Sequence, residues 1–279
     1  MSSQKPLVDR RKLAMNRARA MRRDGDFFLH QEARDEINDR LSIVNKSFAR
    51  PALVTGLPDL WQKWFPDWTV VADDDVLALT EGAHDLVVHA MSLHWANDPV
   101  GQLIQCNRAL EPDGLMLAVF MGDQSLHELR AALAEAEISL HGGLSPRVLP
   151  MGEIRDLGAL LQRASFALPV ADKSTLKLSY ESLFRLSADL RDHGEGLALS
   201  EVAEARINRP LFERAETIYR ESFGEEDRLV ATFDFICLTG WAPDESQPKP
   251  LMPGSAKARL ADALGTKEFK LPQKAGNDP

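Results

Sequence analysis

The chain has 279 residues, of which 44% are apolar and 27% charged, values that are ordinary for a globular protein. Its formal net charge of −9 argues against a general nucleic-acid-binding protein, because such proteins present basic surfaces. No apolar run reaches the roughly 18–20 residues that a membrane span requires, and the first residues lack the apolar core of a secretory signal. We therefore expect a cytoplasmic protein whose two cysteines, Cys106 and Cys237, are reduced core residues.

The N-terminal part of the chain is predicted to be helical. Residues 9–23 form a basic stretch, and between positions 29 and 44 apolar residues recur every three or four positions, which gives one face for packing. Beyond them the expected elements, in chain order, are strand 51–56, helix 57–65, strands 69–72 and 85–91, helix 98–110, strand 115–120, helices 124–138 and 152–164, strand 175–180, helices 181–192 and 210–222, and strand 230–239. Strands that alternate with helices indicate an α/β fold, doubly wound, with a mainly parallel sheet covered on both faces.

These elements suggest three parts of the chain. Residues 1–50 are predicted to be an N-terminal helical extension. Residues 51–242 are predicted to form the α/β domain, with a helical insertion at about 181–223 before the last strand. The proline-rich part, residues 243–279, is predicted to be an extended tail with one short helix near 255–264.

The turn after the first strand departs from what a ligand-binding doubly wound fold requires. There the first strand ends in glycines, because the backbone turns sharply and the ligand approaches it closely. Residues 55–59 read Thr-Gly-Leu-Pro-Asp, with a single glycine and a proline that has no amide donor. Residues 57–68 allow only one short crossover, and residues 72–85 leave no room for another helix and strand. The sheet is therefore expected to have a reduced strand count.

Three tryptophans follow this turn at helical spacing, Trp61, Trp64 and Trp68. Either they pack into the core, or they fill the space that the glycine-rich turn leaves to a ligand; both roles suit large aromatic rings. The basic stretch also has two interpretations. Residues 10–23 carry seven cations and no acid, and they form either a solvated face or a docking site for an acidic partner or a membrane surface.

Several short stretches together resemble a known family. They are residues 92–98 (Ser-Leu-His-Trp-Ala-Asn-Asp), 110–114 (Leu-Glu-Pro-Asp-Gly), 122–130 (Gly-Asp-Gln-Ser-Leu-His-Glu-Leu-Arg) and 142–146 (Gly-Gly-Leu-Ser-Pro). The chain, over roughly residues 10–262, resembles the methyltransferase-like family of the mitochondrial respiratory complex I assembly factor 5 and its α-proteobacterial relatives. This family is a branch of the class I S-adenosylmethionine (SAM)-dependent methyltransferases, and the biotin-pathway malonyl-carrier-protein methyltransferases are more distantly similar.

The resemblance implies a Rossmann-like methyltransferase fold with SAM as cofactor. It implies cofactor contacts from Thr55, Gly56, Asp73, Ser92 and Leu93, with Asp73 at the adenine amino group. Because the glycine-rich turn is missing, we expect a donor pocket whose adenine side persists and whose methionine side is lost. The family's implied role is assembly of NADH:quinone oxidoreductase, with arginine hydroxylation of a subunit suggested for the mitochondrial branch.

The candidate catalytic residues are His94, Trp95 and Asp123, which follow predicted strands. His94 is either an acid or base or the partner of a turn, with Trp95 as a cap on the core. Asp123 either caps the next helix or contacts a substrate. The acidic run 73–75 has no accompanying histidines, so no metal site is expected.

Two functional hypotheses follow. The first is a degenerate methyltransferase-like protein with impaired donor binding, acting as an assembly-type factor for respiratory complex I. Its expected partner is a subunit of the respiratory NADH dehydrogenase, with no nucleic acid and at most peripheral membrane contact. The second is an active SAM-dependent methyltransferase, or an arginine-hydroxylase-type enzyme, with an altered donor pocket. A carrier-protein methyltransferase fits worst, because it depends most on the missing glycine-rich turn.

Overall fold

The computed structural model describes residues 6–23, 25–200, 208–248 and 265. The chain divides into one unit of residues 1–244 and another of residues 245–279, and most of the second unit, with the helix expected near 255–264, lies outside the described residues. The helices of the first unit are α1 (Arg10–Met21), α2 (Phe28–Ile43), α3 (Pro58–Trp64), the short 3₁₀ helix η1 (Leu93–Trp95), α4 (Pro99–Ala109), α5 (His127–His141), α6 (Ile154–Arg163), α7 (Leu183–Asp192) and α8 (Arg209–Phe223). The strands are β1 (Pro51–Thr55), β2 (Thr69–Ala72), β3 (His84–Ala90), β4 (Leu110–Gly122), β5 (Ala167–Tyr180), β6 (Gly224–Glu225) and β7 (Arg228–Trp241).

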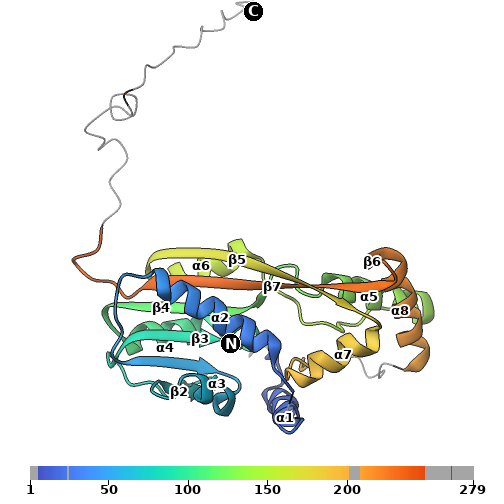
Figure 1. Cartoon of the computed structure of the whole chain (residues 1–279), viewed down its shortest axis with the longest axis horizontal. Helices are drawn as coiled ribbons and strands as arrows, with labels where there is room; N and C mark the ends of the chain where they lie inside the picture. The colour runs from blue at the N-terminus through green and yellow to red at the C-terminus, as the bar shows by residue number, and fades with distance from the viewer. Residues whose placement is uncertain (1–5, 24, 201–207, 249–264, 266–279) are drawn as a thin grey trace, which may run out of the picture. The chain divides into compact units, whose positions relative to one another are not determined.

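One sheet organises the first unit, with strand order β2-β1-β3-β4-β7-β5 and β6 paired to β7 (Figure 1). Strands β2, β1, β3 and β4 are parallel to one another, and the predicted α/β fold is confirmed. Strands β5, β6 and β7 add antiparallel pairs. Because Tyr180 at the end of β5 pairs with Leu229 at the start of β7, helices α7 and α8 form an excursion between two hairpin strands.

Strand β5 begins earlier than the sequence pattern predicts. The expected strand covered residues 175–180, whereas β5 extends from Ala167. Its first half contains Pro169, Asp172 and Lys173, which hide the alternation of apolar and polar residues. The strand tolerates a proline because it lies at the edge of the sheet, next to an irregularity between Ala167 and Val170.

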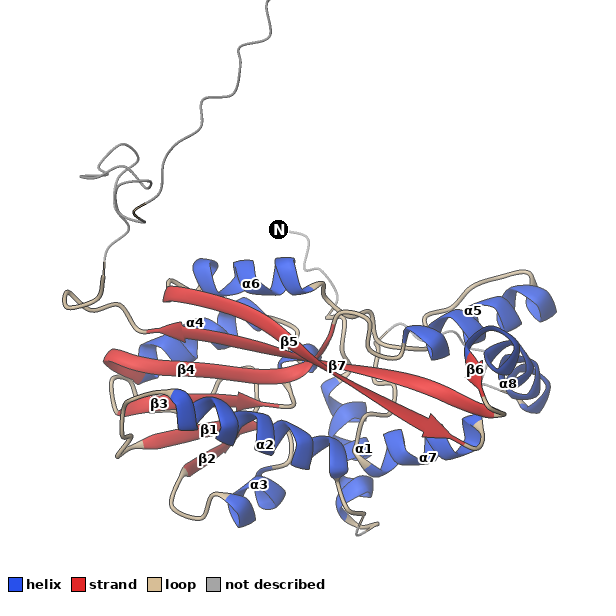
Figure 2. Cartoon of the chain, turned by 45° about the horizontal axis from the view of Figure 1, so that its top comes forward, coloured by secondary structure: helices blue, strands red, loops and turns tan. Residues whose placement is uncertain are grey.

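Helices cover both faces of the sheet (Figure 2), and each face carries its own cluster of buried apolar side chains. Alternate residues of β3 separate them: Leu86 and Val88 pack with residues of α2 and α3, and Val87 packs with residues of α4 and α6. The side-chain period of two in a strand produces this division. The doubly wound arrangement therefore follows from a β3 strand that is buried along its whole length.

The tryptophans pack into the first of these clusters. Trp61 is completely buried, and its Nε1 donates a hydrogen bond of 3.2 Å to Nδ1 of His30 on α2. Trp64 and Trp68 are half-buried against the same cluster, and Trp64 meets Trp61 edge to face at 5.2 Å between ring centroids. Core packing, the simpler of the two interpretations, is thus confirmed for Trp61.

Cys106 and Cys237 are buried and free, as expected. Across the described ranges, no helix combines the length and the apolar character needed to cross a membrane.

Candidate functional site

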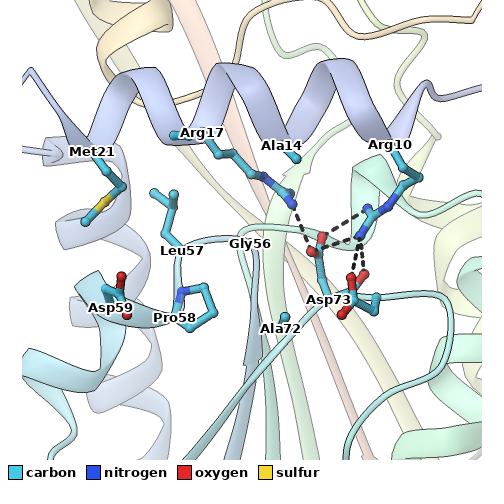
Figure 3. Close-up of a pocket in the computed structure, with 12 residues that line it drawn as sticks. Arg10, Ala14, Arg17, Met21, Gly56, Leu57, Pro58, Asp59, Ala72 and Asp73 are labelled. Atoms are coloured by element: carbon cyan, nitrogen blue, oxygen red, sulfur yellow. Dashed lines mark hydrogen bonds and ion pairs between the residues drawn. The ribbon is translucent and has the colours of Figure 1, made fainter.

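The carboxyl ends of the parallel strands meet at one edge of the sheet, where doubly wound folds bind their ligands. Gly56 follows β1, Asp73 follows β2, Ser92 lies two residues beyond β3, and Asp123 follows β4. Helix α1 lies across this edge above Gly56 and Asp73 (Figure 3). The N-terminal helix therefore takes part in the site that the strands form.

A pocket of about 320 Å³ lies between α1 and the strand ends, and we call it the α1 pocket. Its lining comprises Arg10, Ala14, Arg17, Ala18, Met21, Gly56, Leu57, Pro58, Asp59, Ala72, Asp73 and Asp74. The five residues from α1 follow the pattern i, i+4, i+7, i+8 and i+11, so they form one face of the helix. None of the three tryptophans belongs to this lining, so the tryptophan rings do not fill this pocket.

Asp73 is the buried charge at the base of the α1 pocket, with only 3% of its surface exposed. Nη1 of Arg17 donates to Oδ1 of Asp73 at 2.8 Å, and Nη2 of Arg10 donates to the same oxygen at 3.1 Å. Burial by itself raises the pKa of Asp73, but the charges and hydrogen bonds of Arg17 and Arg10 more than offset it and lower that pKa below its ordinary value. Asp73 is therefore a carboxylate that is already paired within the chain.

Gly56 is covered by the same arginine. A Cβ atom placed on Gly56 would clash with the guanidinium of Arg17, so the guanidinium lies directly against the glycine backbone. Nη2 of Arg17 is buried and has no hydrogen-bond partner within the described residues. A glycine without a side chain lets a ligand come close to the backbone, and here the side chain of Arg17 occupies that place.

Two of the five predicted cofactor contacts, Gly56 and Asp73, line the α1 pocket. Thr55 is fully buried, and its carbonyl oxygen accepts the amide of Asp73 at 3.1 Å. Ser92 and Leu93 are also buried and do not belong to the pocket lining. Ser92 lies beside His89, with 3.4 Å between its Oγ and Nδ1 of that histidine.

The basic stretch differs from the uniform surface that its composition suggests. Arg10 and Arg17 turn inward to Asp73, and Arg23 pairs with Asp192 at 2.8 Å. Three exposed arginines of this stretch have no ion pair within the described residues: Arg11 and Arg19 on α1, and Arg22 directly after it. A docking face on this helix is therefore smaller than the seven cations of residues 10–23 imply.

A second pocket, also of about 320 Å³, lies beyond η1 and the end of β4. Apolar side chains form most of its wall, among them residues of α5, α7 and α8 and of the segment 148–151, and its charged lining residues are Arg147, Arg191 and Glu195. Arg147 is paired with Glu137 at 2.6 Å, and both side chains are almost fully buried. We call this cavity the Glu195 pocket.

Glu195 joins the predicted pair His94 and Trp95. Nε2 of His94 lies 3.1 Å from Oε2 of Glu195, and Nε1 of Trp95 donates to the same oxygen at 2.7 Å. Burial raises the pKa of Glu195, whereas His94 and the hydrogen bond from Trp95 lower it, with a net shift below the ordinary value. Glu195 is therefore an anion inside a largely apolar pocket. Neither composition nor spacing pointed to it, although glycines on both sides of Glu195 indicate a tight loop.

Asp123, the third catalytic candidate, is paired with Lys173 on β5. Its Oδ2 accepts a hydrogen bond from Nζ of Lys173 at 2.5 Å, and it is not among the described residues that line either pocket. The prediction that Asp123 caps the following helix is wrong: α5 begins at His127, the preceding residue Leu126 occupies the cap position, and no side chain caps it. The chain makes an extra turn between β4 and α5, which moves the helix start beyond the reach of Asp123.

No group of three or more histidine, cysteine or acidic side chains in the described ranges has a geometry that could hold a metal ion. In the acidic run 73–75, Asp73 is engaged by arginines, and Asp74 and Asp75 are exposed.

The sequence matches a family model described as a methyltransferase domain over residues 56–118. A Danio rerio protein named arginine-hydroxylase NDUFAF5, mitochondrial, is 34% identical over 235 residues, which are 82% of this chain and 72% of that protein. The Dictyostelium discoideum protein of the same name is 37% identical, and the alignment covers 71% of this chain but only 45% of the relative. A malonyl-[acyl-carrier protein] O-methyltransferase of Laribacter hongkongensis is 30% identical over 62% of this chain and 56% of the relative.

Among solved structures, a putative methyltransferase from Bacillus halodurans is similar over 75% of this chain and 99% of its own, with 13% identity and a TM-score of 0.48.

The cytoplasmic location expected from composition is contradicted by these comparisons. The arginine-hydroxylase relatives of Dictyostelium discoideum, Danio rerio and Homo sapiens all bear the designation mitochondrial. The lack of a long apolar run argues against a membrane-spanning helix. Neither this feature nor the net charge indicates in which aqueous compartment a protein is found.

The Danio rerio relative is aligned over more than two thirds of its length at 34% identity, and the methyltransferase-domain model matches the segment from Gly56 at the end of β1 to Ala118 in β4. The chain thus belongs to the methyltransferase-fold family that contains the NDUFAF5 arginine-hydroxylases.

Proposed function

We propose that this chain is an assembly-type factor for a respiratory NADH dehydrogenase, and that it acts by binding a subunit of that complex without SAM in the α1 pocket. The observation that carries the second half of this proposal is the position of Arg17, against Gly56 and on Asp73. The family supports the first half, because the sequence resembles the complex I assembly factors and is 34–37% identical to NDUFAF5 proteins.

The residues at the α1 pocket fit SAM poorly in this conformation. A donor in a Rossmann-like fold needs a bare glycine backbone and an acid free to accept its hydroxyl or amino groups. Here the glycine backbone is covered by a guanidinium, and the acid is satisfied by two arginines. Leu57 and Pro58 follow in place of further glycines, and Pro58 offers no amide donor.

The exposed cations Arg11, Arg19 and Arg22 provide the candidate docking face for this subunit. Replacing all three by glutamine is expected to weaken recovery of NADH dehydrogenase subunits in a pull-down, and to weaken it most at low salt. If each contributes about 0.2–1 kcal/mol, the affinity falls about three-fold or more.

The matched control replaces three exposed cations elsewhere, Arg155, Arg163 and Lys177, and should bind like the unaltered protein. Equal recovery by both triple variants at all salt concentrations would exclude docking through α1. Failure of the unaltered protein to recover any dehydrogenase subunit would remove the assembly-factor proposal itself.

A second candidate function is action on an arginine side chain, which the names of the relatives suggest and the Glu195 pocket favours. An anionic carboxylate at the wall of an apolar cavity suits a guanidinium on an aliphatic stem. Only Oε2 of Glu195 is engaged by His94 and Trp95, and no hydrogen bond to Oε1 occurs within the described residues.

This candidate predicts that an arginine-containing peptide from the partner subunit binds more tightly than its citrulline analogue, which is neutral and of similar shape. The Glu195→Gln variant should lose about 10- to 100-fold in affinity for the arginine peptide, the value of one charge-assisted hydrogen bond. It should bind the citrulline peptide as before. Calorimetric titration measures both, and equal binding of the two peptides by the unaltered protein rules out recognition of the guanidinium by Glu195.

A further inference from the structure

Helix α1 buries two of its residues, Leu13 and Ala20, against the rest of the first unit, and Leu13 packs with Trp95, Leu149 and Leu199. The side of the helix that faces the α1 pocket is held by polar contacts instead. The contacts inside the α1 pocket are those of Arg10 and Arg17 with Asp73. A helix held in this way can leave its site at a smaller cost than one that buries a continuous apolar face.

Several further hydrogen bonds of α1 and of the residues just before it go to one segment, residues 193–200, in addition to those of Val8 with Asn97 and of Arg23 with Asp192. The amide of Asp9 donates to the carbonyl of Ala198 at 2.8 Å, and the side chain of Asn16 donates to the carbonyl of Gly196 at 2.8 Å. The amide of Ser200 donates to Leu7 at 2.9 Å, which completes an antiparallel bridge between the two segments. The same segment carries Glu195, so α1 and the wall of the Glu195 pocket are mechanically joined.

The backbone of this segment also accommodates Arg17. Gly194 has φ of +79°, and a Cβ there would lie 3.2 Å from Cγ of Arg17. A side chain at position 194 would therefore be strained and would crowd the stem of Arg17. Two glycines allow Arg17 to reach Asp73. Gly194 lies against the aliphatic stem of its side chain, and Gly56 lies against its guanidinium.

We propose that α1 is an intramolecular latch, in which Arg17 is this chain's own occupant of the donor site and an adenosine-bearing ligand enters only when α1 is displaced. The latch deepens the proposed function, since it concerns regulation of the same closed pocket. Its closing contact is the guanidinium of Arg17 on Gly56 and Asp73. Because residues 193–200 hold α1 and also line the Glu195 pocket, a partner bound there would bias the latch through this segment.

The latch lowers the apparent affinity of the α1 pocket for a ligand. If the pocket is open in about 1–10% of molecules, the apparent affinity of any ligand for it is about 10- to 100-fold weaker than the affinity of the open form. Removing the guanidinium of Arg17 removes the closing contact and the occupant together. Arg10 still pairs with Asp73 in that variant, so the buried carboxylate keeps one cation.

The test is calorimetric titration of S-adenosylhomocysteine into the unaltered protein, Arg17→Ala and Arg155→Ala. Arg155 is the matched control, because it carries the same charge, is exposed and lines neither pocket. The latch predicts that Arg17→Ala binds at least about ten-fold more tightly than the other two, which bind alike. If Arg17→Ala does not fold by circular dichroism, Arg17→Gln, which keeps a donor for Asp73, is expected to give the same order.

Equal weak binding by a folded Arg17 variant and the unaltered protein overturns the latch, and leaves the missing glycines as the reason for closure. Tight binding by the unaltered protein, in the low micromolar range, refutes the closed pocket itself and with it the SAM-independent part of the proposed function. Neither result depends on the pull-down, so the latch and the assembly role can fail separately.

Discussion

Replacing Asp73 by alanine is expected to lower the free energy of unfolding by about 3–5 kcal/mol, because it leaves two partly buried guanidinium groups without their common anion. Asp73 is 3% exposed and accepts hydrogen bonds from both Arg10 and Arg17. Urea denaturation measures the change. The control is Asp74→Ala, because Asp74 is the next residue, carries the same charge and has a side chain that is 78% exposed. It should change stability by no more than about 0.5 kcal/mol.

The same pair predicts a dependence on pH. The pKa of Asp73 is lower in the folded protein than its ordinary value, so its contribution to stability is fully present above the unfolded pKa of about 3.9. That contribution is lost as the pH falls through the lower, folded value. Asp73→Asn should therefore have a flatter acid limb of the stability curve than the unaltered protein. Parallel acid limbs would show that Asp73 is not an important anion of the folded state.

Most of the architecture could be predicted because it depends on local patterns. The strand 69–72 is found at the predicted residues, and the helix expected at 98–110 corresponds to α4, Pro99–Ala109. The start of α4 could be predicted because Pro99 occupies the first position of the helix and Asp98 before it is the cap residue. Strand β5 was only half predicted, because an edge strand does not require a regular apolar alternation.

The site could be predicted only in part, because its decisive contacts join residues far apart in the sequence. Asp73 was identified from its position after a strand, but its partners Arg10 and Arg17 lie 63 and 56 residues away. Composition favoured a solvated or docking face for that helix, and nothing in a run of cations distinguishes the arginines that turn inward. Glu195 is 101 residues from His94, so no spacing rule connects the two.

The contrast between Arg17 and the tryptophans shows what the missing glycine-rich turn entails physically. A shortened crossover brings α3 close behind β1, and its aromatic residues complete the core on one side of the sheet. The open edge that remains above Gly56 is polar, since Asp73 lies there. An arginine satisfies such an edge better than a tryptophan, because it neutralises the carboxylate while its planar group packs on the glycine backbone.

Replacing Trp61 by alanine is expected to destabilise the protein by about 3–5 kcal/mol, as large-to-small changes in a core do. Trp61 is fully buried, stacks on Phe65 and donates its indole hydrogen to Nδ1 of His30, and this nitrogen would lose its partner. Trp64→Ala is the matched control on the same helix, and its half-buried ring predicts a smaller loss. Chemical denaturation followed by circular dichroism measures both variants without relying on tryptophan fluorescence. An equal loss of stability in both variants would contradict this expectation, because it would mean that the ring of Trp64 is packed as tightly as that of Trp61.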